Sequence, residues 1–353
     1  MDALKLDQSY LNYTVEMLQK LTAVPSPTGY TKQISAYLVE VLKDLGYSPE
    51  VSNKGAVLCP VGGEGSGLLL SAHVDTLGLM VRALKSNGRL RFTKIGGFHE
   101  ATIENENCVV HTRCGKSYSG TVQLLEPATH VNRELGKQER SDETMEIVID
   151  EKVSSKEDLE KLGISAGDFI SLDPRTTVTP SGYIKSRHLD DKASCAVLLT
   201  LAKYLKDQGV TPKRAVYLLF TTYEEVGHGA SSFVPGDVVD FVSVDMGAVG
   251  DDLTTDECKV SICAKDSMGP YDYDLTGDLI STAKRLGLNF AVDVYPNYGS
   301  DAGAALRAGF DVRHGLVGPG VSASHGYERT HREGLENTLK LLLGYVLQAG
   351  EVK

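Results

Sequence analysis

The sequence contains no tryptophan and few cysteines, and both shortages narrow the classes of protein to which it can belong. The six cysteines are scattered through 353 residues and form no Cys-x-x-Cys pair, at positions Cys59, Cys108, Cys114, Cys195, Cys258 and Cys263. This scatter predicts reduced thiols of a cytosolic protein, not a disulfide framework. The absence of tryptophan removes a side chain that commonly stacks on sugar rings, which counts weakly against a carbohydrate substrate.

Basic residues are also scarce relative to acids. The chain has 36 lysines and arginines against 47 aspartates and glutamates, a formal net charge of -11. The average surface therefore repels polyanions, which counts against a nucleic-acid partner. Cationic substrates or bound metal ions fit this charge balance better.

Long apolar segments are missing as well. No apolar run approaches the roughly 20 residues that cross a bilayer. Residues 1–18 carry acids early and lack a basic region followed by an apolar one, so we expect no signal peptide. We expect a cytoplasmic protein without a membrane partner.

What is present indicates an α/β fold in two domains. Apolar strands at 67–73 and 215–220 alternate with amphipathic helices at 34–45 and 193–205. Residues 77–184 differ, because short alternating segments are separated by turns such as Ser86-Asn87-Gly88. We therefore predict a catalytic domain of residues 1–76 plus 185–353 that contains an inserted β-rich domain of residues 77–184.

Other elements are predicted from local signals. Strands are expected at 108–113, 119–125, 145–149 and 168–172, and helices at 156–162, 278–286, from 301, and at 333–347. The helix at 156–162 follows Ser155, a residue type that caps helix N-termini.

The stretch Arg214 to Gly227 is the most informative segment. Its apolar part, 215–220, does not alternate, as expected for a parallel strand covered on both faces. Two carboxylates, Glu224 and Glu225, follow where open parallel sheets place their chemistry. Neighbouring acids can divide the work of a metal-assisted hydrolase: one binds metal while the other accepts a proton.

Five candidate metal ligands occupy the same kind of position, after an apolar strand or before a helix: His73, Asp190, Glu225, Asp245 and His325. Ligands this far apart in sequence are typical of sites built from several strand ends, unlike structural zinc clips. Imidazole and carboxylate together suit zinc or cobalt, with manganese as an alternative. Individually each is weak, since Asp190 and Asp191 could equally cap the following helix.

The motifs resemble, in order, those of the tetrahedral (glutamyl-type) aminopeptidases, dinuclear metallopeptidases of which some were once labelled cellulases. The resemblance spans essentially the whole chain, and the motifs that carry it are His73-Val74-Asp75-Thr76-Leu77-Gly78, Leu189-Asp190-Asp191-Lys192-Ala193, Tyr223-Glu224-Glu225-Val226-Gly227, Val244-Asp245 and Ser324-His325 with Glu328. It implies a phosphorylase-like α/β/α sandwich catalytic domain with an inserted small β-barrel that helps to build a hollow homo-oligomer, a dodecamer. It also implies an aminopeptidase that acts on peptides with two divalent metal ions per subunit.

The resemblance further implies a role for each residue. Asp190 would bridge both ions, with His73 and Asp245 completing one site and Glu225 and His325 the other. Glu224 would be the general base. Asp75 would accept the remaining N–H of His73, and the Asp190–Asp191 peptide would be strained or cis.

Several alternatives stay open at this stage. The chain has Tyr223 where many relatives have Gln and Gly326 where they have Ser, so His331 competes with His325 as the last ligand. His188 is a weaker candidate ligand. A related dinuclear deacylase or carboxypeptidase would use the same ligand types, a glycoside hydrolase could use the Glu224–Glu225 pair, and a scaffold could retain a dead site.

Overall fold

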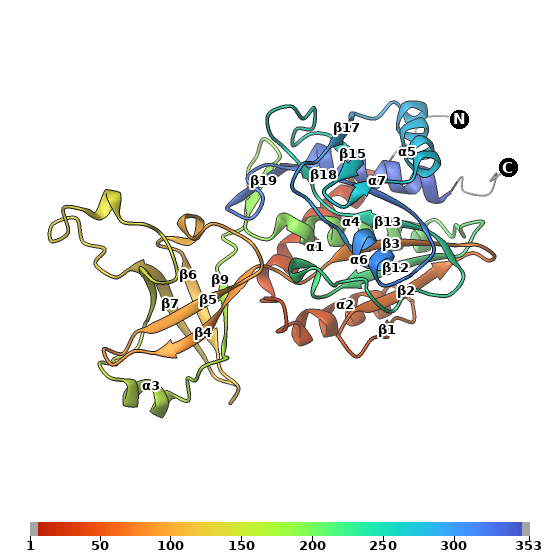
Figure 1. The fold of residues 1–353 in the computed structure, drawn as a ribbon. Coiled ribbons are helices and arrows are strands. Elements are labelled where there is room, and N and C mark those ends of the chain that lie inside the picture. The colour runs from red at the N-terminus through yellow and green to blue at the C-terminus, as the bar shows by residue number, and fades with distance from the viewer. Residues whose placement is uncertain (1–5, 348–353) are drawn as a thin grey trace.

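The computed structural model describes residues 6–347, which form an α/β body and a smaller β-barrel beside it (Figure 1). The predicted α/β fold with an inserted barrel is confirmed. The expectation about a signal peptide falls partly on residues 1–5, which lie outside the described residues.

The α/β body is built on one large mixed sheet. Its strand order is β1-β2-β12-β3-β13-β18-β15-β16, with β14 pairing with β18 and β17 with β15. The bounds are β1 Glu50–Val51, β2 Val57–Gly62, β3 Gly67–His73, β12 Val216–Thr221, β13 Val238–Val244, β14 Gly247–Ala248, β15 Val260–Asp266, β16 Gly269–Pro270, β17 Phe290–Val294 and β18 Arg313–Val321. The central strands β12, β3, β13 and β18 are parallel, so their carboxyl ends meet at one edge.

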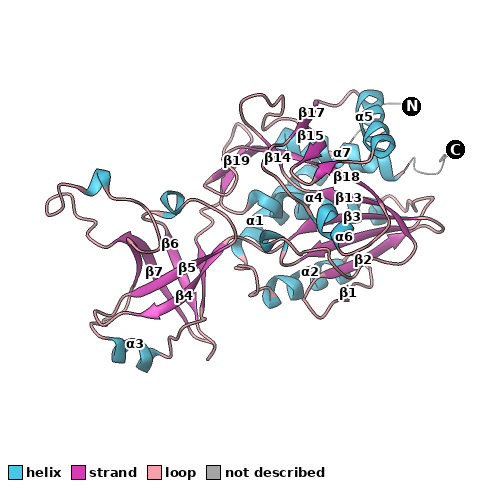
Figure 2. Ribbon diagram, viewed as in Figure 1, coloured by secondary structure: helices cyan, strands magenta, loops and turns pink. Residues whose placement is uncertain are grey.

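Helices cover the two faces of this sheet unequally (Figure 2). The larger apolar core joins one face to α1 Gln8–Ala23, α2 Lys32–Asp44, α4 Leu189–Asp207, α5 Tyr273–Leu286 and α7 Arg332–Val346. The other face packs against the short helix α6 Asp301–Arg307 and loops. Alternation along β3 explains the two cores: Leu68 and Leu70 belong to the first and Leu69 to the second.

The insertion forms a closed barrel in the strand order β4-β5-β8-β7-β6-β9 (Figure 1). The bounds are β4 Gly78–Leu84, β5 Leu90–Ile95, β6 Asn107–His111, β7 Ser117–Leu124, β8 Met145–Ile149 and β9 Phe169–Leu172, with the 3-10 helices η1 Glu100–Ile103 and η2 Leu135–Lys137 and the helix α3 Lys156–Leu162 between strands. Closure pairs both edges of the sheet, and a separate apolar core fills the interior. The predicted Asn87-Gly88 hairpin is confirmed, because β4 pairs antiparallel with β5 and Gly88 has a φ of 78°.

A small sheet joins the returning chain to the α/β body. It contains β10 Thr177–Val178, β11 Tyr183–Ser186 and β19 Glu328–His331. The domain boundary predicted between residues 184 and 185 falls inside β11. The assignment of a catalytic role to one domain and an oligomerisation role to the other remains a prediction.

Most predicted elements are present, with one shifted start. The helix predicted from residue 278 begins at Tyr273, because the Asp272 carboxylate accepts a hydrogen bond from the Leu275 N–H at 2.8 Å and caps it. Strands β15 and β17 were not predicted from the sequence. No helix among residues 6–347 is long and apolar enough to cross a membrane.

Candidate active site

Elements distant in sequence bring the predicted site residues to one edge of the main sheet. His73 ends β3, Asp245 follows β13, and Asp190 lies in the first turn of α4. Glu224 and Glu225 lie in the 3-10 helix η3 (Glu224–Val226) after β12. His325 lies in the loop between β18 and β19.

The Asp190 carboxylate occupies the middle of this group. Its Oδ1 lies 2.9 Å from Nε2 of His73, and its Oδ2 lies 3.4 Å from Nε2 of His325. Glu225 Oε2 is 3.7 Å from the His325 ring nitrogen, and Glu224 Oε2 is 3.8 Å from that of His73. Ligand atoms of His73, Asp190 and Asp245 all lie within 4.8 Å of one another. One carboxylate therefore faces two imidazoles, with a further acid beside each.

Both histidines are oriented by a backbone carbonyl. Nδ1 of His73 donates to the carbonyl oxygen of Asp75 at 3.0 Å, and Nδ1 of His325 donates to that of Gly97 at 2.5 Å. A hydrogen bond at Nδ1 directs Nε2 at the neighbouring group, the arrangement common for metal-binding histidines. Because Gly97 follows β5, the barrel helps to position His325.

Asp75 differs from the expectation in one detail. Its carboxylate is 3.8 Å from Nδ1 of His73, too far for a hydrogen bond. It accepts instead from the Thr28 hydroxyl at 2.6 Å and from the backbone N–H groups of Glu224 and Glu225 at 3.2 and 3.4 Å. These donors draw the carboxylate toward η3, so Asp75 fixes the loop that carries the two glutamates.

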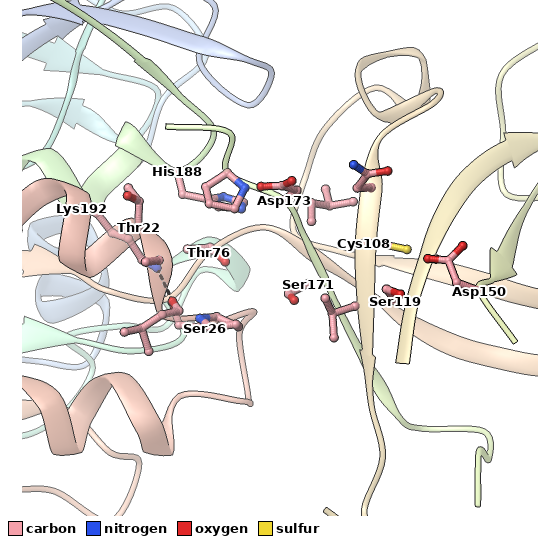
Figure 3. Close-up of a pocket in the computed structure, with 18 residues that line it drawn as sticks. Thr22, Ser26, Thr76, Cys108, Ser119, Asp150, Ser171, Asp173, His188 and Lys192 are labelled. Atoms are coloured by element: carbon pink, nitrogen blue, oxygen red, sulfur yellow. Dashed lines mark hydrogen bonds between the residues drawn. The ribbon is translucent and has the colours of Figure 1, made fainter. Parts of the chain in front are cut away.

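The two alternative histidines make other contacts. His331 donates from Nε2 to the Ser181 carbonyl and accepts at Nδ1 from the Glu333 N–H, at the start of α7. His188 lines a cavity of about 420 Å³ between the α/β body and the barrel, with Lys192 and Asp173 (Figure 3), and it also borders a small pocket beside Asp190 and His325 without a hydrogen bond to either among residues 6–347. Within residues 6–347, His325 is thus the one of these three histidines whose ring nitrogen lies within 4 Å of the Asp190 carboxylate.

Three buried residues support the site although sequence reasoning assigned them no role. The Glu328 carboxylate accepts from the backbone N–H groups of Asp190 and His325, both at 3.1 Å. Asp191 Oδ2 accepts from the His73 N–H at 3.2 Å. Arg187 donates to the Gly326 carbonyl at 3.3 Å and contacts the Thr102 carbonyl in the barrel. The His-x-x-Glu spacing from His325 to Glu328 was a sequence signal for Glu328, whereas no sequence pattern pointed to Arg187.

The backbone near these side chains adopts uncommon conformations. Tyr223 and His325 have φ values of 67° and 62° without being glycine, and the Asp190–Asp191 peptide bond is cis. Left-handed non-glycine residues of this kind cluster at functional sites.

Burial and the proximity of several carboxylates shift the pKa values of the acidic residues in the candidate site. Burial, together with the neighbouring Asp190 carboxylate, raises the pKa of Glu225 to about 8 and that of Asp245 to about 7. Burial also raises the pKa of Glu224 well above its usual value. Burial would raise the pKa of Asp190 too, but hydrogen bonds from His325 and His73 outweigh it and lower that pKa.

This donor set fits divalent cations. Within the described chain, the salt bridges of these carboxylates are made with histidines, and none is made with lysine or arginine. In addition, Oδ1 of the fully buried Asp191 has no hydrogen-bond partner among residues 6–347. Buried carboxylates normally need a compensating positive charge, and imidazole with carboxylate is a ligand set that zinc, cobalt and manganese accept.

Residues 55–341 match the sequence profile described as M42 glutamyl aminopeptidase. A provisionally named aminopeptidase of Bacillus subtilis, YhfE, is 44% identical over 94% of this chain and 97% of its own length. The TET1 peptidase of Pyrococcus horikoshii, whose structure is described as assembling into a tetrahedron or a large octahedral shell, superposes with a TM-score of 0.84 at 25% identity, over 95% of this chain and 99% of that one. The aminopeptidase APDkam598 of Desulfurococcus kamchatkensis superposes with a TM-score of 0.86 at 23% identity, over 96% of both chains, and shows the shared fold.

Proposed function

Since the chain belongs to the M42 glutamyl aminopeptidase family, we propose that it is a metal-dependent aminopeptidase that releases N-terminal residues from peptides with two divalent metal ions. The observation that supports this most is the Asp190 carboxylate, which presents one oxygen to His73 and the other to His325. A carboxylate placed in this way can serve two ions at once.

The residues divide into two ligand sets around Asp190. His73 and Asp245 would complete one set, and Glu225 and His325 the other, with zinc or cobalt as the expected ions and manganese as an alternative. When bound, such ions supply Lewis-acid chemistry and lower the pKa of water from about 15.7 to about 7.

Glu224 is the proposed general base. It is the acid beside His73 that neither ligand set requires, and burial raises its pKa, which makes the ionised carboxylate a stronger proton acceptor. Glu224 takes a proton from the attacking water as the new C–O bond forms. It then transfers this proton to the nitrogen of the leaving amine as the C–N bond breaks. Asp75 keeps the loop in place by accepting from the backbone of Glu224.

The variant Glu224→Gln tests this role. It keeps the size of the side chain but removes the proton acceptor, so the turnover rate on aminoacyl chromogenic substrates falls by roughly 10² to 10⁴. Metal content per chain stays unchanged. A matched control is Glu336→Gln, because Glu336 lies on α7 and pairs with Lys340. Hydrolysis by Glu224→Gln at the normal rate would show that the assignment is wrong.

A comparison of substrate classes tests which reaction the protein catalyses. Peptides with a free N-terminus should be hydrolysed, whereas N-acyl amino acids and cellulose should not. Turnover of N-acyl amino acids in preference to free-amine peptides would favour a deacylase.

We also propose a cytoplasmic homo-oligomer whose contacts involve the inserted domain of residues 77–184. The assembly of the Pyrococcus horikoshii TET1 peptidase supports this proposal. Light scattering should give a mass of many chains, with twelve as the expected number, and a monomer would contradict it.

A further inference from the structure

The two proposed ligand sets are held in place in different ways. His73 ends β3 and Asp245 follows its parallel neighbour β13, so the main sheet fixes both. His325 instead lies in the ligand loop, residues 323–327 between β18 and β19, which a backbone bridge from Ser322 to Arg329 closes. The side chain of His325 is 40% exposed, whereas that of His73 is 2% exposed. The position of His325 therefore depends on contacts that the ligand loop makes with other segments.

The ligand loop is held from the side of the barrel. The ring of His325 donates to a carbonyl in the segment after β5, as described above. The Gly326 carbonyl accepts from Nη1 of Arg187 at 3.3 Å. The Tyr327 hydroxyl donates to the Arg175 carbonyl at 2.9 Å, and the Arg175 guanidinium lies over the Tyr327 ring, 4.0 Å from its centroid. Three successive residues of the loop are thus fixed by the barrel or by the chain that returns from it.

Arg187 connects the ligand loop directly to the barrel. It lies between β11 and α4 and is only 3% exposed. While Nη1 reaches the ligand loop, Nη2 contacts the carbonyl of Thr102 in η1. Nη2 also lies 3.2 Å from Oε1 of Glu106, which compensates the buried charge. Because the guanidinium is planar and its donors have fixed directions, these contacts set the distance between the ligand loop and the barrel.

One donor of this side chain is left over. Nε of Arg187 is buried and has no hydrogen-bond partner among residues 6–347. A buried donor without a partner costs free energy, so stability alone does not account for an arginine at this position. The two terminal nitrogens, which join the loop to the barrel, are the ones that are satisfied.

We propose that Arg187 is a positioning residue that sets the affinity of the ion bound by Glu225 and His325. It does so by holding the ligand loop against the barrel. This role rests on the proposed function, because it requires two bound ions. The ion of His73 and Asp245 does not depend on Arg187, since the main sheet positions both of those ligands. The barrel is therefore needed for one of the two ligand sets and not for the other.

Metal titration of the full-length protein tests the proposal. Metal is removed by chelation, and Co²⁺ is added back while calorimetry resolves the two binding steps. Arg187→Met keeps the length of the side chain but removes its donors, so we expect one step to weaken about 10- to 100-fold and the other to stay unchanged. The weakened step should be the one that His325→Ala loses, which assigns it to the second ligand set. Excess Co²⁺ should restore peptidase activity to Arg187→Met, because Arg187 takes no part in the reaction.

Two comparisons separate positioning from a general loss of stability. Arg82→Met is the matched control, because Arg82 lies on β4 of the barrel and pairs only at the surface with Asp142 and Glu143 among the described residues. It should leave both binding steps unchanged. In the metal-free protein, amide hydrogen exchange of residues 323–327 should be faster in Arg187→Met than in this control, with the remaining amides alike.

Arg187→Lys provides a second test that keeps the positive charge. A lysine can reach only one of the two carbonyls that Arg187 joins, so the affinity of the second ion should lie between those of the unchanged protein and Arg187→Met. If Arg187→Met fails to fold, unchanged affinity for both ions in Arg187→Lys overturns the proposal.

The outcomes also separate this proposal from the proposed function. Equal affinities in Arg187→Met and Arg82→Met, an equal loss in both binding steps, or activity that excess Co²⁺ does not restore overturns the role of Arg187 and leaves the peptidase function intact. Fewer than two ions in the unchanged protein would overturn the two-metal function, and the role of Arg187 with it.

Discussion

The carboxylate of Glu328 contacts the backbone of Asp190, 138 residues earlier in the sequence, and also the backbone of His325 in its own segment. One oxygen accepts from the Asp190 N–H and the other from the His325 N–H, and Glu328 is only 2% exposed. At the scale of the residue, the site therefore depends on groups that do not themselves face the substrate.

Glu328→Ala should weaken metal binding. It leaves two backbone N–H groups without an acceptor, and loss of a residue that supports a ligand typically lowers metal affinity about 10- to 100-fold. Glu328→Gln keeps one acceptor oxygen and should have the smaller effect. The metal concentration for half-maximal activity measures both, with Glu336→Gln as control. Equal metal affinity in Glu328→Ala and the control would contradict this positioning role.

Metal affinity should also depend on pH in a defined direction. Burial holds the pKa of Glu225 at about 8 and that of Asp245 at about 7, so in the metal-free protein both carry protons below those values. Metal must displace these protons, so affinity falls as the pH drops from about 8 to about 6. Calorimetry in buffers of different ionisation enthalpy should detect proton release at pH 7. Binding without proton release would show that the acids are already ionised.

The residues of the candidate site could be predicted from the sequence, whereas the hydrogen bonds among them could not. A polar residue directly after an apolar strand is visible in sequence, which is why His73, Glu225 and Asp245 could be named. His73 donates to the backbone carbonyl of Asp75 and not to its carboxylate, because the carboxylate accepts hydrogen bonds from Thr28 and from the backbone of η3. Such contacts between distant segments have no sequence pattern.

At the scale of the element, helix boundaries could be predicted where a local signal such as a capping residue marks them. Strands that depend on contacts with distant segments could not. Helix α3 was predicted over its observed span, because the Ser155 cap accepts from the Asp158 N–H. Strand β17 was missed because its alternating segment buries Asp293, whose carboxylate accepts hydrogen bonds from Thr254 and Thr255 in another loop. The cap at Asp272 was present in the sequence and would have moved the start of α5 to its observed position.

Two glycine substitutions should act in opposite directions. A Cβ at Gly318 in β18 would lie 1.8 Å from the Asp245 carbonyl oxygen, so Gly318→Ala must push β18 away from the residue after β13. We expect the free energy of unfolding to fall by about 1–3 kcal/mol. A Cβ at Gly277 in α5 would meet no atom within 4 Å, and Gly277 has no positive φ, so Gly277→Ala should stabilise by about 0.5–1 kcal/mol. Urea unfolding midpoints measure both changes, and a stable Gly318→Ala would contradict the close contact.

At the scale of the whole molecule, the α/β body and the barrel meet beside the site. The chain leaves the main sheet just after His73 and re-enters the α/β body through β11 just before Asp190, and Gly97 from the barrel side contacts His325. The inserted barrel was inferred from turn signals together with family resemblance, since alternating strands alone do not specify closure.

Chelation should abolish peptidase activity without unfolding the protein. The apolar cores of the body and the barrel do not include the candidate ligands, so circular dichroism should remain native after metal removal. Activity should return when zinc or cobalt is added. Full activity in the chelated protein would exclude a role for metal in the reaction.

The placement of the barrel within the chain also sets an order for folding during translation. All barrel strands lie between residues 78 and 172, so the barrel can close as soon as that stretch has left the ribosome. The apolar strand β3 precedes it, yet its two neighbours, β12 and β13, begin only at residues 216 and 238. The nascent chain must therefore expose the hydrophobic strand β3 without its partner strands while the barrel is synthesised. We expect chaperones to bind the nascent chain during this interval.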